Sequence, residues 1–396
     1  MTFEYLFSDI KKLNVFLFIV VFAVCLEFTF DQKARNLLLV AFMAISSLTL
    51  IFHRSFYKSD VFLLCFAFCL LGFPILAHDN ETRWSTIIYS CLFFTSFAVF
   101  TRAFHVSNYS RYDFLVTLKF LLYAYCLVLI IQQVSVVIGL PPLNLRNYNA
   151  LEPFKLNSLG AEPSWSGRII ALLFYCYITV KEFVVKKDYN FKDNFKEDKW
   201  VWFSFLWSMI TMISGTAMAF LVIVLFKFVR LQKKVFVIIP LFLVLIFVAE
   251  NSHFKPYERM RDTTMATLTL DEQKIIQADH SASFRIVPLI SLIKSVDISS
   301  FEGIFGHGVD SVSQDLDFGL GVATSTTSLV GVWYEFGFIA FILFIYFSFR
   351  LCFDIKSPVS IVFWFMLVFL YGLNTQIPWL AIMLLFMTKH YSNDKA

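Results

Sequence analysis

A short polar stretch, Glu162-Pro-Ser-Trp-Ser-Gly-Arg168, stands directly before an apolar run of the sequence. Its proline disfavours a helix at Glu162, and Gly167 permits an abrupt start of the following run. A carboxylate such as Glu162 can accept a proton, and a guanidinium such as Arg168 can grip two oxygens of a phosphate. The alternative interpretation is purely structural: a helix cap with an interfacial tryptophan, Trp165. Residue spacing alone leaves both interpretations open.

A second group of polar residues lies further along the chain. Glycines in "GIFGHGVDS" (303–311) allow a tight turn that would place His307 and Asp310 near any bound ligand. Arg285 begins an apolar segment too short to span a membrane. A lone loop histidine or arginine is most often just solvated. Glu335, in contrast, falls inside the outer end of a predicted span, where an unpaired carboxylate is costly, and this favours a function.

No metal or cofactor is predicted. The seven cysteines fall in or beside apolar segments, which makes a disulfide scaffold a poor interpretation. No Cys-x-x-Cys or Cys/His spacing indicates zinc. The sequence therefore does not require a metal.

The composition indicates the kind of structure that holds these residues in place. Of 396 residues, 58% are hydrophobic and 16% are charged, whereas a soluble domain carries about 25% charged residues. Such a chain belongs in a bilayer. We expect an all-α polytopic integral membrane protein with about twelve transmembrane helices in a single membrane domain, residues 1–396. The predicted spans are 13–30, 37–52, 61–77, 86–101, 114–139, 168–185, 200–213, 217–230, 235–249, 326–349, 358–373 and 377–388.

The placement of Lys and Arg predicts the orientation. With the N-terminus inside, four short inner loops carry ten Lys/Arg residues and the four opposing short loops carry three. Both termini are then cytoplasmic. Two longer loops, 140–167 and 250–325, fall on the periplasmic side, and the second is expected to carry short helices. The runs 200–213 and 217–230 are too short to span a core of about 30 Å, so we expect two short helices that turn within the outer leaflet.

The order of these features resembles a known family. Glu-Pro-Ser at 162–164 opens a span and a short helix pair follows. The large outer loop carries Arg285 and Phe-Gly-His-Gly (305–308), and the next span carries Trp-Tyr-Glu-Phe-Gly (333–337). This order resembles the O-antigen and capsule polysaccharide polymerases of the Wzy type, which share a fold with the O-antigen ligases. The resemblance covers roughly residues 150–345.

One departure concerns the short helix pair. Many relatives carry an arginine after the serine that joins the two helices, whereas here Gly215 follows Ser214. If a pyrophosphate is bound there, another arginine must supply the charge.

The resemblance implies an inner-membrane glycosyltransferase acting on undecaprenyl-pyrophosphate-linked oligosaccharides, without nucleic acid. Membrane lipids surround it, and a chain-length regulator and a flippase are its implied partners. Arg285 and Arg168 would stabilise the leaving pyrophosphate, and Glu162 or His307 would accept the proton of the attacking hydroxyl. The implied substrate-binding residues are Arg168, Arg285, Ser164, Trp165, Asp310 and Glu335.

Two other functions stay open from the sequence. A ligase of the same fold would pass finished glycan to lipid A core, and the sequence does not exclude it. A flippase or other carrier would place ionisable residues in mid-membrane and repeat its halves. Here the spans are nearly free of charge, and only Lys119 comes close to such a position.

Overall fold

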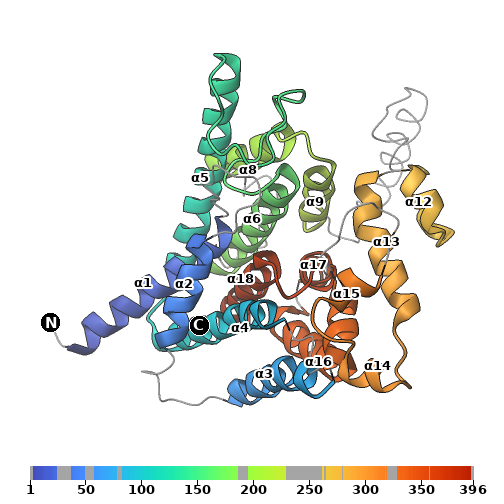
Figure 1. Cartoon of the computed structure of the whole chain (residues 1–396). Helices are drawn as coiled ribbons and strands as arrows, with labels where there is room; N and C mark the ends of the chain where they lie inside the picture. The colour runs from blue at the N-terminus through green and yellow to red at the C-terminus, as the bar shows by residue number, and fades with distance from the viewer. Residues whose placement is uncertain are drawn as a thin grey trace.

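Helices make up the regular structure of the described part of the chain. The computed structural model describes residues 3–24, 37–49, 58–77, 83–185, 195–228, 261–262, 265–278, 280–316, 318, 328–355 and 357–393, and no strand occurs among them. The helices, in the order of the chain (Figure 1), are α1 (Phe3–Ala23), α2 (Leu37–Leu48), α3 (Lys58–Ala77), α4 (Trp84–Val106), α5 (Arg111–Val137), α6 (Pro163–Val185), α8 (Lys199–Thr211), α9 (Gly215–Phe226), α12 (Glu272–Ala278), α13 (His280–Ser295), α14 (Phe301–Phe305), α15 (Ser311–Asp315), α16 (Leu329–Cys352), α17 (Val359–Trp364), the π-helix η2 (Phe365–Phe369) and α18 (Gln376–Asn393). The all-α prediction is confirmed for these residues.

Three described helices are long and apolar enough to cross a membrane: α4, α5 and α16. Other apolar helices are shorter, as in α2 and α9. The predicted span 235–249 lies outside the described residues. These helices indicate association with a membrane.

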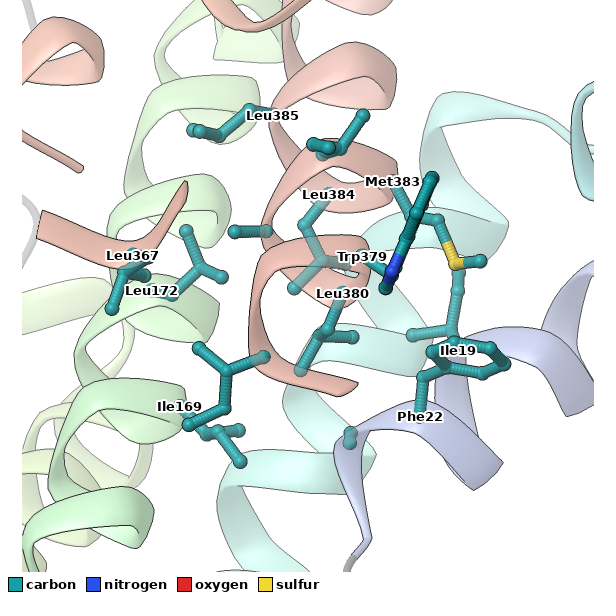
Figure 2. Packing of buried hydrophobic residues seen from close by; sticks show 14 of the residues in the cluster. Ile19, Phe22, Ile169, Leu172, Leu367, Trp379, Leu380, Met383, Leu384 and Leu385 are labelled. Carbon is teal, nitrogen blue, oxygen red and sulfur yellow. The ribbon is translucent and has the colours of Figure 1, made fainter. Parts of the chain in front are cut away.

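The core is built around α18, whose side chains from Gln376 to Leu385 are all buried. Figure 2 shows Trp379, Leu380 and Met383 of this helix against Ile19 and Phe22 of α1. On its other side lie the side chains of α6 and η2, among them Ile169, Leu172 and Leu367. The helix that follows the polar segment 370–375 is therefore fixed from several sides.

The expected short helix pair is α8 and α9. Their 13 and 12 residues correspond to about 20 and 18 Å at 1.5 Å per residue. α8 packs on α5, and α9 packs on α6. α9 runs parallel to α6, because Ala217 meets Gly167 near the start of both helices, and Lys227 reaches Thr179 (2.8 Å) near their ends.

Polar contacts between helices and loops divide the bundle into two ends. The end with both chain termini has the ion pairs Lys12–Asp113 (2.8 Å), Asp60–Arg102 (3.0 Å) and Lys119–Asp198 (3.3 Å), and a hydrogen bond from Ser392 to Asp354 (2.8 Å). At the other end, Arg83 lies 3.6 Å from Asp310 and the loop after α5 packs beside α6. The Lys/Arg pattern assigns the first end to the cytoplasm, and this orientation stays a prediction. We call the second end the site end.

Candidate functional site at one end of the bundle

The polar stretch at 162–168 forms the beginning of α6. Pro163 is the first helical residue, a position that proline favours because it has no N–H to leave unsatisfied. The predicted loop 140–167 therefore ends at Glu162. The Glu162 carbonyl accepts hydrogen bonds from the amides of Trp165 and Ser166 (both 3.1 Å), and its carboxylate accepts one from the Ser164 hydroxyl. The half-buried carboxylate is thus held at the helix start.

Amide side chains fix the loop that leads into α6. Asn144 donates to the carbonyls of Ser158 (2.9 Å) and Gly160 (3.0 Å), and Asn147 donates to Ala161 (3.1 Å). A third, Asn157, donates to Arg146 (2.8 Å). Because the Asn147 contact reaches Ala161, the residue before Glu162, the loop holds that residue in one position.

A close approach of α9 explains Gly167. A Cβ atom at this glycine would lie 2.6 Å from the Cβ of Ala217, so a larger residue would push α6 and α9 apart. Ser214 caps α9 by accepting a hydrogen bond from the Ala217 amide (3.4 Å). Two helix N-termini therefore meet here. Each carries a partial positive charge of about half a unit and favours a bound anion.

Arg168, the residue after Gly167, adds a full positive charge to the first turns of α6. It is 5% exposed, and its guanidinium carbon lies 5.1 Å from the centre of the Tyr371 ring, a cation–π distance. Among the described residues it is one of two buried basic side chains, and the other is Lys11, in the N-terminal half of α1. Burial and the contact with Tyr371 hold the Arg168 side chain inside the protein near the start of α6.

The segment that contains Tyr371 was not among the predicted site residues. This segment joins η2 to α18, and its Asn374 accepts a hydrogen bond from Ser90 of α4. Gln376 donates to the Phe22 carbonyl (3.3 Å). The buried hydroxyl of Thr375 has no hydrogen-bond partner among the described residues. The polar run Asn-Thr-Gln between two apolar runs was the signal that could have identified it.

The glycine loop at 306–308 packs into a break in α16. Gly337 has φ +86° and ψ 166° inside this helix, so the carbonyls before it lose their usual partners. The amides of His307 and Gly308 donate to the carbonyls of Tyr334 (2.8 Å) and Glu335 (3.2 Å). The sequence predicted one uninterrupted span here. The break instead creates a socket for the loop, which Figure 1 shows where α14 and α15 meet α16.

The side chains of this loop contact α16 and α4. The His307 ring stacks on Tyr334 with centres 4.0 Å apart, and its Nδ1 lies 3.2 Å from the Tyr334 carbonyl oxygen. Because a carbonyl only accepts, Nδ1 carries the proton and Nε2 is the basic nitrogen. Asp310 accepts a hydrogen bond from Thr86 (2.9 Å). Glu335 is 1% exposed.

The predicted residues form two groups linked through α4. Glu162, Ser164, Trp165 and Arg168 belong to the start of α6, and His307, Asp310 and Glu335 belong to the glycine loop and α16. The link runs from Tyr371 and Asn374 through Ser90 and Thr86 to Asp310.

Arg285 lies in α13, a helix that packs on α16. Its side chain is outside the described part of the structure. Val287 and Leu292 of the same helix are buried against Val330 and Tyr334. The backbone of Arg285 therefore lies over the N-terminal part of α16, on the side of the second group.

The prediction of no metal did not take one short motif into account. Residues 315–317 read Asp-Leu-Asp, an Asp-x-Asp arrangement in the large loop. Asp315 accepts a long hydrogen bond from the Tyr334 hydroxyl (3.5 Å), and residue 317 lies outside the described residues. In the described part of the chain, no three His, Cys, Asp or Glu side chains gather as metal ligands.

Comparison with protein-family models, with curated proteins and with solved structures finds no match. The chemistry of the site end is therefore inferred from its residues. The residues at the site end offer a buried cation in the first turns of α6, a carboxylate held at the start of the same helix, and a histidine whose Nδ1 faces the Tyr334 carbonyl oxygen. This set suits a substrate with a phosphate group and a transferable proton.

Proposed function

We propose that the chain is an O-antigen polymerase of the bacterial inner membrane, crossing it about twelve times with both termini in the cytoplasm. In this proposal the site end faces the periplasm. The observation that carries the proposal is the burial of Arg168 in the first turns of α6, one residue after the glycine that α9 approaches. A site of this kind can neutralise the charge that develops on a leaving pyrophosphate.

The proposed reaction transfers a growing glycan between two lipid-linked substrates. The bond between the sugar C1 and the pyrophosphate oxygen breaks, and the electron pair leaves with undecaprenyl pyrophosphate. A hydroxyl of a new lipid-linked repeat unit forms the bond to C1, and its proton passes to a base. Arg168 stabilises the leaving group, with Arg285 as a second ligand from α13. Ser164, Trp165 and Asp310 line the sugar path.

Glu162 is the base that the geometry favours. Its carboxylate sits at the start of the helix that carries Arg168 and is oriented by the Ser164 hydroxyl. The Nε2 of His307 is a second acceptor, but the ring is stacked on Tyr334 and belongs to the second group. Glu335, buried in the broken helix, supports the glycine loop through its carbonyl.

The other functions receive less support. A flippase needs cationic groups inside the bundle for the lipid pyrophosphate. Lys119 and Lys227, however, are engaged at the opposite end, with Asp198 (3.3 Å) and Glu182 (3.1 Å). A ligase would use the same site with lipid A core as acceptor, and the next experiment separates it from a polymerase.

Deleting the gene should leave cells that display lipid A core capped with a single repeat unit. Export of the unit and its ligation would continue, and only polymerisation would be lost. Gel analysis of the surface glycan measures this. Loss of all surface repeat units with lipid-linked units trapped inside would indicate a flippase. Accumulation of long polymerised chains that remain on the carrier lipid would indicate a ligase.

The proposed orientation predicts reporter-fusion results. A fusion at Lys196, before α8, should report a cytoplasmic location, and fusions at Asn149 and Thr269 should report a periplasmic location. The excess of Lys and Arg in the short loops at the other end motivates this expectation. Alkaline phosphatase and green fluorescent protein fusions provide the two readouts. A cytoplasmic signal from Thr269 would place the site end on the wrong side of the membrane for this reaction.

A further inference from the structure

The loop between α5 and α6 turns large apolar side chains outward. Leu151 is 90% exposed, whereas Leu156 and Leu159 of the same loop are buried. The other large apolar residues of the loop that are exposed are Ile138, Leu140, Leu143, Leu145 and Phe154. A loop in water would bury such residues or replace them, so their exposure needs a cause.

These side chains have no room inside the loop. Its interior is occupied by the amide groups of Asn144, Asn147 and Asn157, which bond to the loop backbone. Gln132 of α5 enters from below, where its oxygen accepts from the Ser158 amide (2.8 Å). Turning a leucine inward would break several of these hydrogen bonds. The outward orientation is therefore a fixed property of the loop.

The exposed surface of the loop continues the exposed side of α5. Along this helix the large exposed apolar residues are Val116, Phe120, Leu127, Ile131, Val134 and Val137. No charged residue occurs from Phe120 to Leu145, so the uncharged zone runs past the end of the helix and stops at Arg146. Figure 1 shows α5 at the edge of the molecule, with its upper end projecting beyond its neighbours. The medium that surrounds the exposed side of α5 must therefore also contact the loop.

Helix length sets the depth at which the loop lies. From Val116 to Val137 the exposed side of α5 covers 21 residue steps, or about 32 Å at 1.5 Å per residue. The hydrocarbon core of a bilayer is about 30 Å thick, and about 40–45 Å with the headgroup regions. The loop therefore begins where the hydrocarbon ends and the headgroup region starts.

An open hollow lies at this depth, between the end of α5 and the loop. Its volume is about 620 Å³, and its lining includes Val136, Leu140, Pro142, Tyr148 and Phe154. The lining is mostly apolar, and Tyr148 adds an aromatic ring with a polar tip. Aromatic residues of this kind concentrate at membrane interfaces.

We propose that the loop 138–154 is seated in the outer interface of the lipid bilayer. Leu143, Leu151 and Phe154 contact phospholipid acyl chains, and the hollow takes up part of one chain. This inference does not depend on the proposed reaction. It has a consequence for the site, because Asn147 bonds to Ala161 (3.1 Å), the residue before Glu162. A loop held by lipid therefore holds the start of α6 at the level of the headgroups.

Photo-crosslinking in a defined bilayer tests this proposal. The full-length protein is placed in nanodiscs of phosphatidylethanolamine and phosphatidylglycerol with benzoylphenylalanine at position 143 or 151. After irradiation, intact mass spectrometry identifies what the probe has captured. We expect phospholipid adducts from both positions, in a yield comparable with that from a probe at Leu127 on the exposed side of α5. A probe at Gln277, exposed on α12, should give no lipid adduct.

Several results would overturn the proposal. If Leu127 captures lipid while positions 143 and 151 capture none, the loop lies in water. Capture of a second copy of the chain at 143 and 151 would make the surface a dimer interface. Absence of lipid adducts at Leu127 would remove α5 from the bilayer, and equal capture at Gln277 would mean that lipid contact is not a property of this loop.

Discussion

Replacing Arg168 with alanine should abolish long glycan chains while the protein still inserts at a normal level. If the guanidinium stabilises the leaving pyrophosphate, losing this oriented donor costs on the order of 10²–10³ in rate. A loss of this size removes the ladder of polymer bands from a gel. Arg168→Lys keeps the charge but loses the two-pronged hydrogen bonding, so it should retain part of the activity.

The matched control for this prediction is Arg102→Ala. Arg102 is also largely buried and pairs with Asp60 (3.0 Å), but at the opposite end of the bundle. Its loss should reduce stability without shortening the ladder. The ladder is measured in a deletion strain complemented with each variant, and membrane abundance is checked by immunoblotting. Full-length ladders from Arg168→Ala would remove this residue from the mechanism.

Gly337→Ala should destabilise the protein strongly, because Gly337 allows the break in α16. Its φ and ψ of +86° and 166° lie in a region that only glycine occupies readily, at a cost of about 1–3 kcal/mol for another residue. The added Cβ would also lie 2.1 Å from the Ile304 carbonyl oxygen. We therefore expect a clear fall in the thermal midpoint, measured by fluorescence-detected size-exclusion chromatography of purified protein.

Gly72→Ala provides the comparison. Gly72 is helical, and the nearest atom to an added Cβ is on the Phe68 ring at 3.5 Å, an ordinary contact. Alanine also favours a helix more than glycine does, so this variant should be as stable as the parent or more stable. Equal thermal midpoints for the two variants would show that the break in α16 does not require glycine.

Local patterns in the sequence predicted the features that depend on a few neighbouring residues. The short run lengths around Ser214 predicted the α8–α9 pair, whereas the span predicted to begin at Arg168 begins at Pro163 instead. The assignment of Gly167 was different, because the glycine is needed for contact with Ala217 rather than for starting the helix.

Features that depend on distant residues could not be predicted in this way. The contact of Arg168 with Tyr371 joins segments about 200 positions apart. The sequence near either residue does not indicate this contact. The break at Gly337 is stabilised by amides of the loop at 307–308. Without that loop, "WYEFGF" is simply a helical apolar run.

The central claim is that the chain itself joins lipid-linked repeat units. It is tested most directly with purified protein in nanodiscs and the lipid-linked repeat unit extracted from the deletion strain. The account predicts products of two or more repeat units on one carrier lipid, with one undecaprenyl pyrophosphate released for each bond formed. Arg168→Ala, folded to the same extent, should give neither product. Wild-type protein that is folded but neither lengthens the glycan nor releases undecaprenyl pyrophosphate would contradict the account.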